Sequence, residues 1–133
     1  MIKDIDFRKV TDLAMAVTPA EEDAGETWKV YLINLKDCPI NNIMVSSKGY
    51  GTIDGKPVKT SSLRQFIEKL EGEQYIVLEI LPKELTTLNN QFWVSFWVDG
   101  VLYDKKYVFV TESINEDYFT KIPVLDKRGV MIK

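Results

Sequence analysis

The chain has 133 residues, a formal net charge of −3 at pH 7, 45% hydrophobic residues and 28% charged residues. This length predicts a single domain spanning residues 1–133 with its own core, and the composition is typical of a folded globular protein rather than a disordered one. Because binding to nucleic-acid phosphates needs a basic patch, the acidic balance argues against a nucleic-acid partner.

The sequence contains no histidine, and Cys38 is its only cysteine. The commonest general base near neutral pH is therefore missing, and so are the Ser-His-Asp and Cys-His nucleophile arrangements and the usual zinc ligand sets. Paired carboxylates can catalyse glycoside hydrolysis without histidine. The candidate carboxylates, however, are expected to lie mostly in solvent: Glu68, Glu71, Glu73 and Glu79. We expect that the protein is not an enzyme and that it uses no metal or cofactor.

Cellular location is suggested by the cysteine content and by the start of the chain. A single thiol fits a reducing compartment better than a secreted one. Residues 1–6 contain two aspartates where a signal peptide would have a basic start and an apolar stretch, and no run approaches the roughly 18 apolar residues of a membrane span. These features predict a cytoplasmic protein with no membrane partner.

The first third of the chain is rich in strand signals. The second half of residues 6–18 is predicted to form a strand that stops at Pro19, although leucine, alanine and methionine also favour a helix over residues 10–17. The acidic residues 21–26 are bunched rather than alternating, which indicates a solvated connection and not a calcium loop. Residues 27–35 are apolar at nearly every position, as in a central strand covered on both faces.

The middle of the chain contains one ambiguous segment. Residues 36–39 are expected to form a turn, and residues 40–47 a strand. The Asp54-Gly55 pair within residues 49–58 indicates a small hairpin or a long loop in which the glycines are turn residues. Residues 61–70 fit either a short helix beginning at Ser62 or a strand. We favour a strand that turns at Gly72 into a second strand over 75–80. Residues 83–88 are expected to be a loop or a single helical turn.

The clearest element is a long antiparallel hairpin over residues 89–110. Asp99-Gly100 favours a two-residue turn because both central positions need a positive φ. The expected partners on one face are Val98 and Val101, Phe96 and Tyr103, Val94 and Lys105, and Phe92 and Tyr107; on the other they are Trp97 and Leu102, Ser95 and Asp104, and Trp93 and Lys106.

Lys105 interrupts the apolar face of this hairpin. Either its stem lies along the rim of the core, or a bulge near residues 103–106 shifts the register and turns Tyr107 and Phe109 inward. The sequence leaves both alternatives open.

The candidate binding residues are Trp93, Trp97 and Tyr50. If the Phe92 face points inward, the two tryptophans point outward on one strand, about 13 Å apart. Exposed aromatic rows are used by β-sandwich modules to bind sugars or proteins. Two alternatives remain: a C-terminal or loop segment covers both tryptophans, or a bulge makes them part of the core.

Near the end of the chain, residues 122–125 and 130–132 offer one or two short edge strands. The sum of about seven or eight short strands, separated by glycine, proline, asparagine and aspartate turns, predicts an all-β fold. We expect a two-sheet antiparallel sandwich, with room for one short helix.

Two turns carry a resemblance to a known class. Asn34-Leu35-Lys36-Asp37-Cys38-Pro39-Ile40 joins two strands, and Leu70-Glu71-Gly72-Glu73 leads into the strand at 75–81. Residues 27–110 resemble immunoglobulin-like modules of the cell-adhesion-related (CARDB-type) and fibronectin III-like classes, where an Asn-rich turn and a Gly-Glu step occupy these places. Pro-Gly-Glu is usual at that step, and Glu71-Gly72-Glu73 stands here. The resemblance implies an interaction scaffold and supplies no catalytic residues.

The whole chain, most clearly residues 45–51 and 127–133, is also similar to a set of small bacterial proteins. Some of these are labelled as the α subunit of phenylalanyl-tRNA synthetase. A class II synthetase core needs a large sheet with ATP-binding arginines, whereas this short chain has only Arg8, Arg64 and Arg128. We therefore expect no synthetase activity.

The sequence favours an interaction module that acts through protein–protein contact or self-association, with a protein partner or a homodimer. The alternative is a small-ligand or carbohydrate-binding module that uses Trp93, Trp97 and Tyr50.

Overall fold

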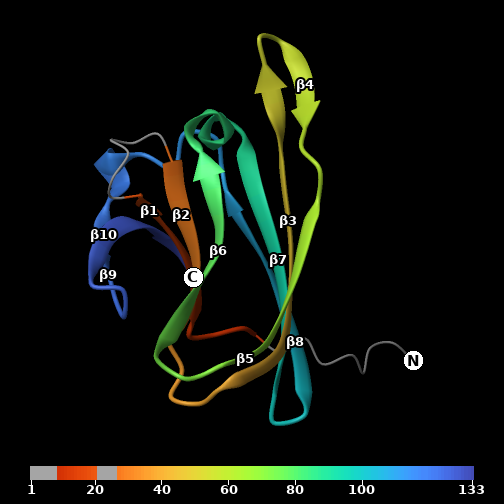
Figure 1. The fold of residues 1–133 in the computed structure, drawn as a ribbon, viewed down its shortest axis with the longest axis vertical. Coiled ribbons are helices and arrows are strands. Elements are labelled where there is room, and N and C mark those ends of the chain that lie inside the picture. The colour runs from red at the N-terminus through yellow and green to blue at the C-terminus, as the bar shows by residue number, and fades with distance from the viewer. Residues whose placement is uncertain (1–8, 21–26) are drawn as a thin grey trace.

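The computed structural model describes residues 9–20 and 27–133, and it is an all-β sandwich of two antiparallel sheets (Figure 1). Residues 1–6 and the acidic connection at 21–26, which carry two of the expectations above, lie outside the described residues. The strands are β1 (Leu13–Pro19), β2 (Thr27–Asn34), β3 (Ile40–Ile53), β4 (Lys56–Lys59), β5 (Leu63–Leu70), β6 (Gln74–Pro82), β7 (Asn89–Val98), β8 (Val101–Phe109), β9 (Thr120–Ile122) and β10 (Lys127–Ile132), with short 3₁₀ helices η2 (Lys83–Thr87) and η3 (Glu116–Tyr118).

The two sheets have a simple order. One sheet runs β6-β2-β1-β10-β9, and the other runs β4-β3-β7-β8, with β5 also paired to β3. The described residues thus form ten strands rather than seven or eight, because β4 is a strand of its own and the C-terminal segment forms two strands, β9 and β10. The architecture is consistent with an immunoglobulin-like fold.

The β7–β8 hairpin has the predicted register from Phe92–Tyr107 to Val98–Val101 without interruption. Asp99 and Gly100 have φ values of 49° and 75°, as the expected turn requires. Tyr107 and Phe109 are buried without any bulge between β7 and β8. Lys105 is half-buried with its Nζ 5.1 Å from the Tyr107 ring centre. The rim position of Lys105 is therefore confirmed, and the proposed bulge is wrong.

A buried hydrogen bond joins the hairpin to the opposite sheet. The Tyr107 hydroxyl donates to the Leu13 carbonyl at 2.9 Å, and burial raises the pKa of Tyr107. Leu13 begins β1, so the predicted strand before Pro19 is confirmed and the helix alternative is wrong.

β2 is covered on both faces, as its apolar sequence predicted. Val30 and Leu32 face the interior of the sandwich, while Tyr31 and Ile33 belong to a second buried cluster on the outer side of the sheet. Residues from the C-terminal segment complete this second cluster, among them Ile122 and Leu125. The C-terminal segment therefore covers the sheet that contains β1 and β2.

The strand interpretation of residues 61–70 is confirmed by β5. β3 is longer than expected: it continues through Gly49 and Gly51 to Ile53 and turns at Asp54-Gly55 into β4, and this hairpin projects beyond the rest of the sandwich (Figure 1). Gly49 and Gly51 are thus strand residues rather than turn residues. A Cβ on Gly49 would lie 3.2 Å from Thr60 Cγ2, so glycine permits this close approach.

The fully buried Asn34 ties together the two connections that cross between the sheets. Its amide donates to the carbonyls of Cys38, Leu70 and Glu71 at 2.9, 3.2 and 3.1 Å, and its Oδ1 accepts from the Lys36 backbone N–H at 3.0 Å. The β2–β3 and β5–β6 turns are therefore held at one end of the molecule. None of the described residues forms a helix that is long and apolar enough to span a membrane.

Candidate binding face

The outer face of the β5-β3-β7-β8 sheet carries a group of exposed apolar side chains. Phe92, Val94 and Phe96 on β7 are buried, and the alternation of a strand places Trp93 and Trp97 on the opposite side. The tryptophans are 47% and 40% exposed. The alternatives in which the described residues cover them, or in which a bulge makes them core, are therefore wrong.

Neighbouring strands extend this surface. Met44 on β3 is paired with Ser95, which lies between the two tryptophans, and Phe66 on β5 is paired with Met44. On the other side, Leu102 on β8 is paired with Trp97. All are at least 40% exposed, and together they form the surface that we call the tryptophan face: Met44, Phe66, Trp93, Trp97 and Leu102.

Charged side chains of both signs surround the tryptophan face. Lys106 lies opposite Trp93, with its Nζ 5.1 Å from the Trp93 ring, a distance at which a cation is attracted to an aromatic face. Asp104 lies opposite Ser95, and Arg64 lies opposite Ser46, the β3 partner of Trp93. The apolar centre thus has a polar rim, as protein-binding surfaces commonly do.

Tyr50 lies apart from the two tryptophans. It is half-buried and is paired with Asn89, whereas Trp93 is paired with Ser46, four residues earlier on β3. Four residues of strand separate these positions by about 13 Å. The structure brings Trp93 and Trp97 together on one face but places Tyr50 towards the β3–β4 hairpin.

Sequence reasoning did not single out Met44 and Phe66 as members of this face. Their position depends on how β3 pairs with both β5 and β7, and no local signal in the sequence specifies that register. The alternation of β5 gives a partial signal, because Ile67 packs against the core and the adjacent Phe66 must then point outward.

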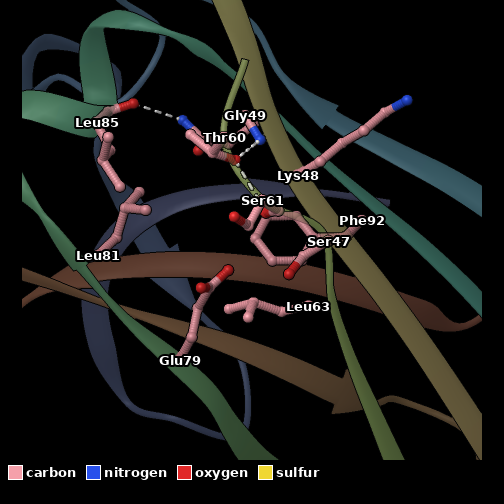
Figure 2. A pocket seen from close by; sticks show the side chains of 11 residues that line it. Ser47, Lys48, Gly49, Thr60, Ser61, Leu63, Glu79, Leu81, Leu85 and Phe92 are labelled. Atoms are coloured by element: carbon pink, nitrogen blue, oxygen red, sulfur yellow. Dashed lines mark hydrogen bonds between the residues drawn. The ribbon is translucent and has the colours of Figure 1, made fainter.

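A separate cavity lies on the inner side of the same sheet. It has a volume of ≈ 200 Å³ and is formed between β3, β6, β7, η2 and the segment that enters β5 (Figure 2). Leu63, Leu81, Leu85 and Phe92 form its apolar walls, and the polar lining residues are Ser47, Lys48, Thr60, Ser61, Glu79 and Asn90, with Gly49 between them.

Glu79 is the only acidic residue among the described ones that lines this cavity. Burial raises the pKa of the Glu79 carboxyl, and a hydrogen bond with Ser47 partly offsets this effect. Figure 2 shows the carboxylate directed towards Ser61 and Ser47, while the Lys48 chain points away. Within the described residues, no lysine or arginine forms an ion pair with Glu79.

A β-bulge explains why this carboxylate faces inward. Val30 is paired with Glu79 but Tyr31 with Val77, so Leu78 is an extra residue in β6. Tyr75 and Val77 are exposed on the outer side, whereas Leu81 is buried in the core. Strict alternation would give Glu79 the outward direction of Tyr75 and Val77, but the extra residue Leu78 turns it to the inner side, which it shares with Leu81.

In residues 9–20 and 27–133, no group of three or more histidine, cysteine, aspartate or glutamate side chains is arranged to hold a metal ion. Comparison of the sequence with protein-family models and with curated proteins finds no match.

Proposed function

We propose that the chain is a non-enzymatic interaction module that binds protein through the tryptophan face, with a second copy of the chain as the first partner to test. The observation that carries this proposal is the convergence of five large apolar side chains from four strands on one solvent-facing surface. Burial of such side chains against a partner removes apolar area from water and favours association. Tryptophan is also enriched among the residues that contribute most to protein interfaces.

The strand order supports placement among immunoglobulin-like modules of the fibronectin III-like or CARDB type. The run β6-β2-β1 corresponds to strands E, B and A of such a sandwich, and β3-β7-β8 corresponds to C, F and G, with β5 beside C. We propose this membership as the structural basis of the interaction role, since these modules present sheet faces and loops to partners.

The size of the tryptophan face predicts weak association. Four strands spaced about 4.8 Å apart span about 14 Å, and Trp93 and Trp97 are about 13 Å apart. This surface is much smaller than the roughly 800 Å² that each partner buries in a standard interface. Charges of both signs on the rim, including Asp104 and Lys106, suit a two-fold contact in which each copy offers the other an opposite charge.

Sedimentation equilibrium tests this proposal directly. We expect the wild-type protein to dimerise reversibly between about 10 μM and about 1 mM, the range of weak interfaces. The double variant Trp93→Ser/Trp97→Ser should raise the dimer dissociation constant at least about tenfold. Tyr118→Ser removes an exposed aromatic ring elsewhere and should change nothing. A monomeric wild type, or a double variant that dimerises equally well, would contradict self-association through this face.

A second candidate function is carbohydrate binding on the same surface. Ser95 lies between the two tryptophans on β7 and is paired with Asp104, so hydrogen-bonding groups stand between two aromatic platforms. Sugars are bound by this combination of ring stacking and polar contacts. A glycan array that shows no binding, together with concentration-dependent dimerisation, would exclude this alternative.

A further inference from the structure

The inner cavity beside β5 differs from the tryptophan face because it contains one acidic group among apolar walls. Glu79 is directed into it, and Leu63, Leu81, Leu85 and Phe92 surround its apolar part. A carboxylate in such surroundings loses hydration, and the loss is costly unless a partner of opposite charge replaces the water. From this geometry, we infer that the cavity binds a primary alkylammonium group, with the ammonium on Glu79 and the alkyl chain along the leucine and phenylalanine side chains.

The other polar groups support one cationic contact rather than several. The Thr60 hydroxyl accepts from the Gly49 backbone N–H at 2.7 Å and donates to the Ser61 carbonyl at 3.2 Å. The Asn90 amide donates to the Leu85 and Leu88 carbonyls at 2.9 and 3.2 Å. These bonds shape the cavity wall and leave the carboxylate of Glu79 as the charged recognition group.

The chemistry of the ligand follows from the number and kind of acceptors. A divalent cation such as Ca²⁺ takes six or more oxygen ligands, which a single carboxylate does not supply. An ammonium group has three donors, and these can be shared between Glu79 and the hydroxyls of Ser47 and Ser61, towards which the carboxylate points (Figure 2). The cavity volume of ≈ 200 Å³ accommodates a short aliphatic chain behind it.

The bulge in β6 is an independent observation in favour of a binding role. It turns Glu79 from the exposed row of Tyr75 and Val77 to the inner side of the sheet. Bulges of this kind frequently re-aim a side chain next to a functional site. Glu79 has no ion-pair partner among the described residues, since Lys48 points away from it (Figure 2), and a neutral side chain would pack at this position equally well.

The experiment is an NMR titration of ¹⁵N-labelled protein with n-butylammonium chloride, with sodium chloride of equal ionic strength as the reference. We expect saturable shifts centred on Gly49, Ser61 and Glu79. Ethylammonium and methylammonium should bind progressively more weakly, by about fourfold for each methylene removed from the apolar walls. Nα-acetyl-lysine methylamide distinguishes the source of the ligand: equal or tighter binding indicates a lysine side chain of a protein, and no binding indicates a free amine.

Glu79→Gln is the decisive variant, and it should weaken butylammonium binding at least about tenfold, as expected when one partner of a half-buried charge pair is removed. Because this change removes a half-buried charge, the variant should fold with undiminished thermal stability at neutral pH. Glu68→Gln alters an exposed carboxylate and should bind as the wild type does. Shifts that follow ionic strength alone, or binding that persists in Glu79→Gln, would overturn the inference. Either result leaves the sedimentation test of the tryptophan face unaffected.

Discussion

Asn34 shows how one polar side chain organises two distant segments. Its amide and carbonyl groups bind backbone groups of the β2–β3 turn and of the β5–β6 turn, 36 and 37 residues away. Gly72 lies in the second turn, where a Cβ would be 2.8 Å from backbone atoms of Lys36, Asp37 and Cys38. The two turns therefore pack so closely that only glycine fits between them.

Replacement of Asn34 should be strongly destabilising. In Asn34→Ala, buried carbonyls lose their donor, and we expect the free energy of unfolding to fall by about 2–3 kcal/mol. Asn34→Asp keeps the acceptor for Lys36 N–H but removes the donors, so it should be at least as harmful. Urea unfolding followed by circular dichroism measures both. Asn41→Ala, at a half-exposed position, should stay within about 0.5 kcal/mol of the wild type; an equal loss there would contradict the role of Asn34.

Glu79 gives stability a distinctive pH dependence. Burial raises its pKa above the ordinary value of 4.5 in the folded protein, so the folded state holds this proton more tightly than the unfolded state does. Its contribution to stability is fully present below 4.5 and is lost as the pH rises through the raised pKa. We expect Glu79→Gln to be more stable than the wild type at neutral pH and to match it in acid.

Thermal melts of both proteins between acid and neutral pH measure this difference. Taking the difference between wild type and variant removes the contribution of the other carboxylates. If Glu79→Gln instead became less stable than the wild type at neutral pH, the folded protein would be stabilising the charged form of Glu79. That result would contradict burial as the main cause of the raised pKa.

At the scale of single residues, the sequence predicted the directions of Trp93 and Trp97 but not that of Glu79. The tryptophans follow from strict alternation in one hairpin whose turn residues specify the register. Glu79 faces inward because of a bulge that depends on pairing between β2 and β6. No local sequence pattern specifies this pairing between distant strands. The expectation that Glu79 lies mostly in solvent is wrong for this reason.

At the scale of elements, the β7–β8 hairpin is specified by its own sequence. Its turn offers a clean test because a Cβ on Gly100 would meet no atom within 4 Å, although the φ of this residue is 75°. Gly100→Ala should therefore cost about 1 kcal/mol through backbone conformation alone. Gly72→Ala, which meets backbone atoms, should cost more, about 2 kcal/mol or above.

Chemical denaturation of the two glycine variants measures this ranking. Asp99→Asn serves as the matched control, because Asn-Gly forms the same turn as Asp-Gly and stability should stay unchanged. If Gly100→Ala proved more harmful than Gly72→Ala, the close packing of the two crossover turns would be contradicted.

β3 marks the limit of prediction for elements. Its glycines suggested a turn, yet the strand continues through Gly49 and Gly51 to pair with β4, β5 and β7. Glycine there permits the close approach of Thr60 and Leu88 rather than a change of direction. A glycine that serves packing and one that serves a turn look the same in the sequence.

At the scale of the whole molecule, alternation and turn chemistry were enough to predict a two-sheet sandwich. They could not predict which sheet the C-terminal segment covers. β9 and β10 extend the β1 sheet, and Ile122 and Leu125 pack on its outer side. The opposite sheet keeps Trp93 and Trp97 in solvent. This asymmetry, in which the C-terminal segment covers β1 and β2 on one outer face while the tryptophan face stays open on the other, is the physical basis of the proposed interaction role.

Hydroxyl-radical footprinting of the whole protein at low and high concentration, with mass spectrometry as readout, tests this claim most directly. At low concentration, Trp93, Trp97 and Met44 should be oxidised readily, and the fully buried Met15 should be protected. At high concentration, oxidation of the first three should slow, whereas that of Tyr118 should not. Equal oxidation rates at both concentrations, or protection of Trp93 and Trp97 in the dilute protein, would contradict the account.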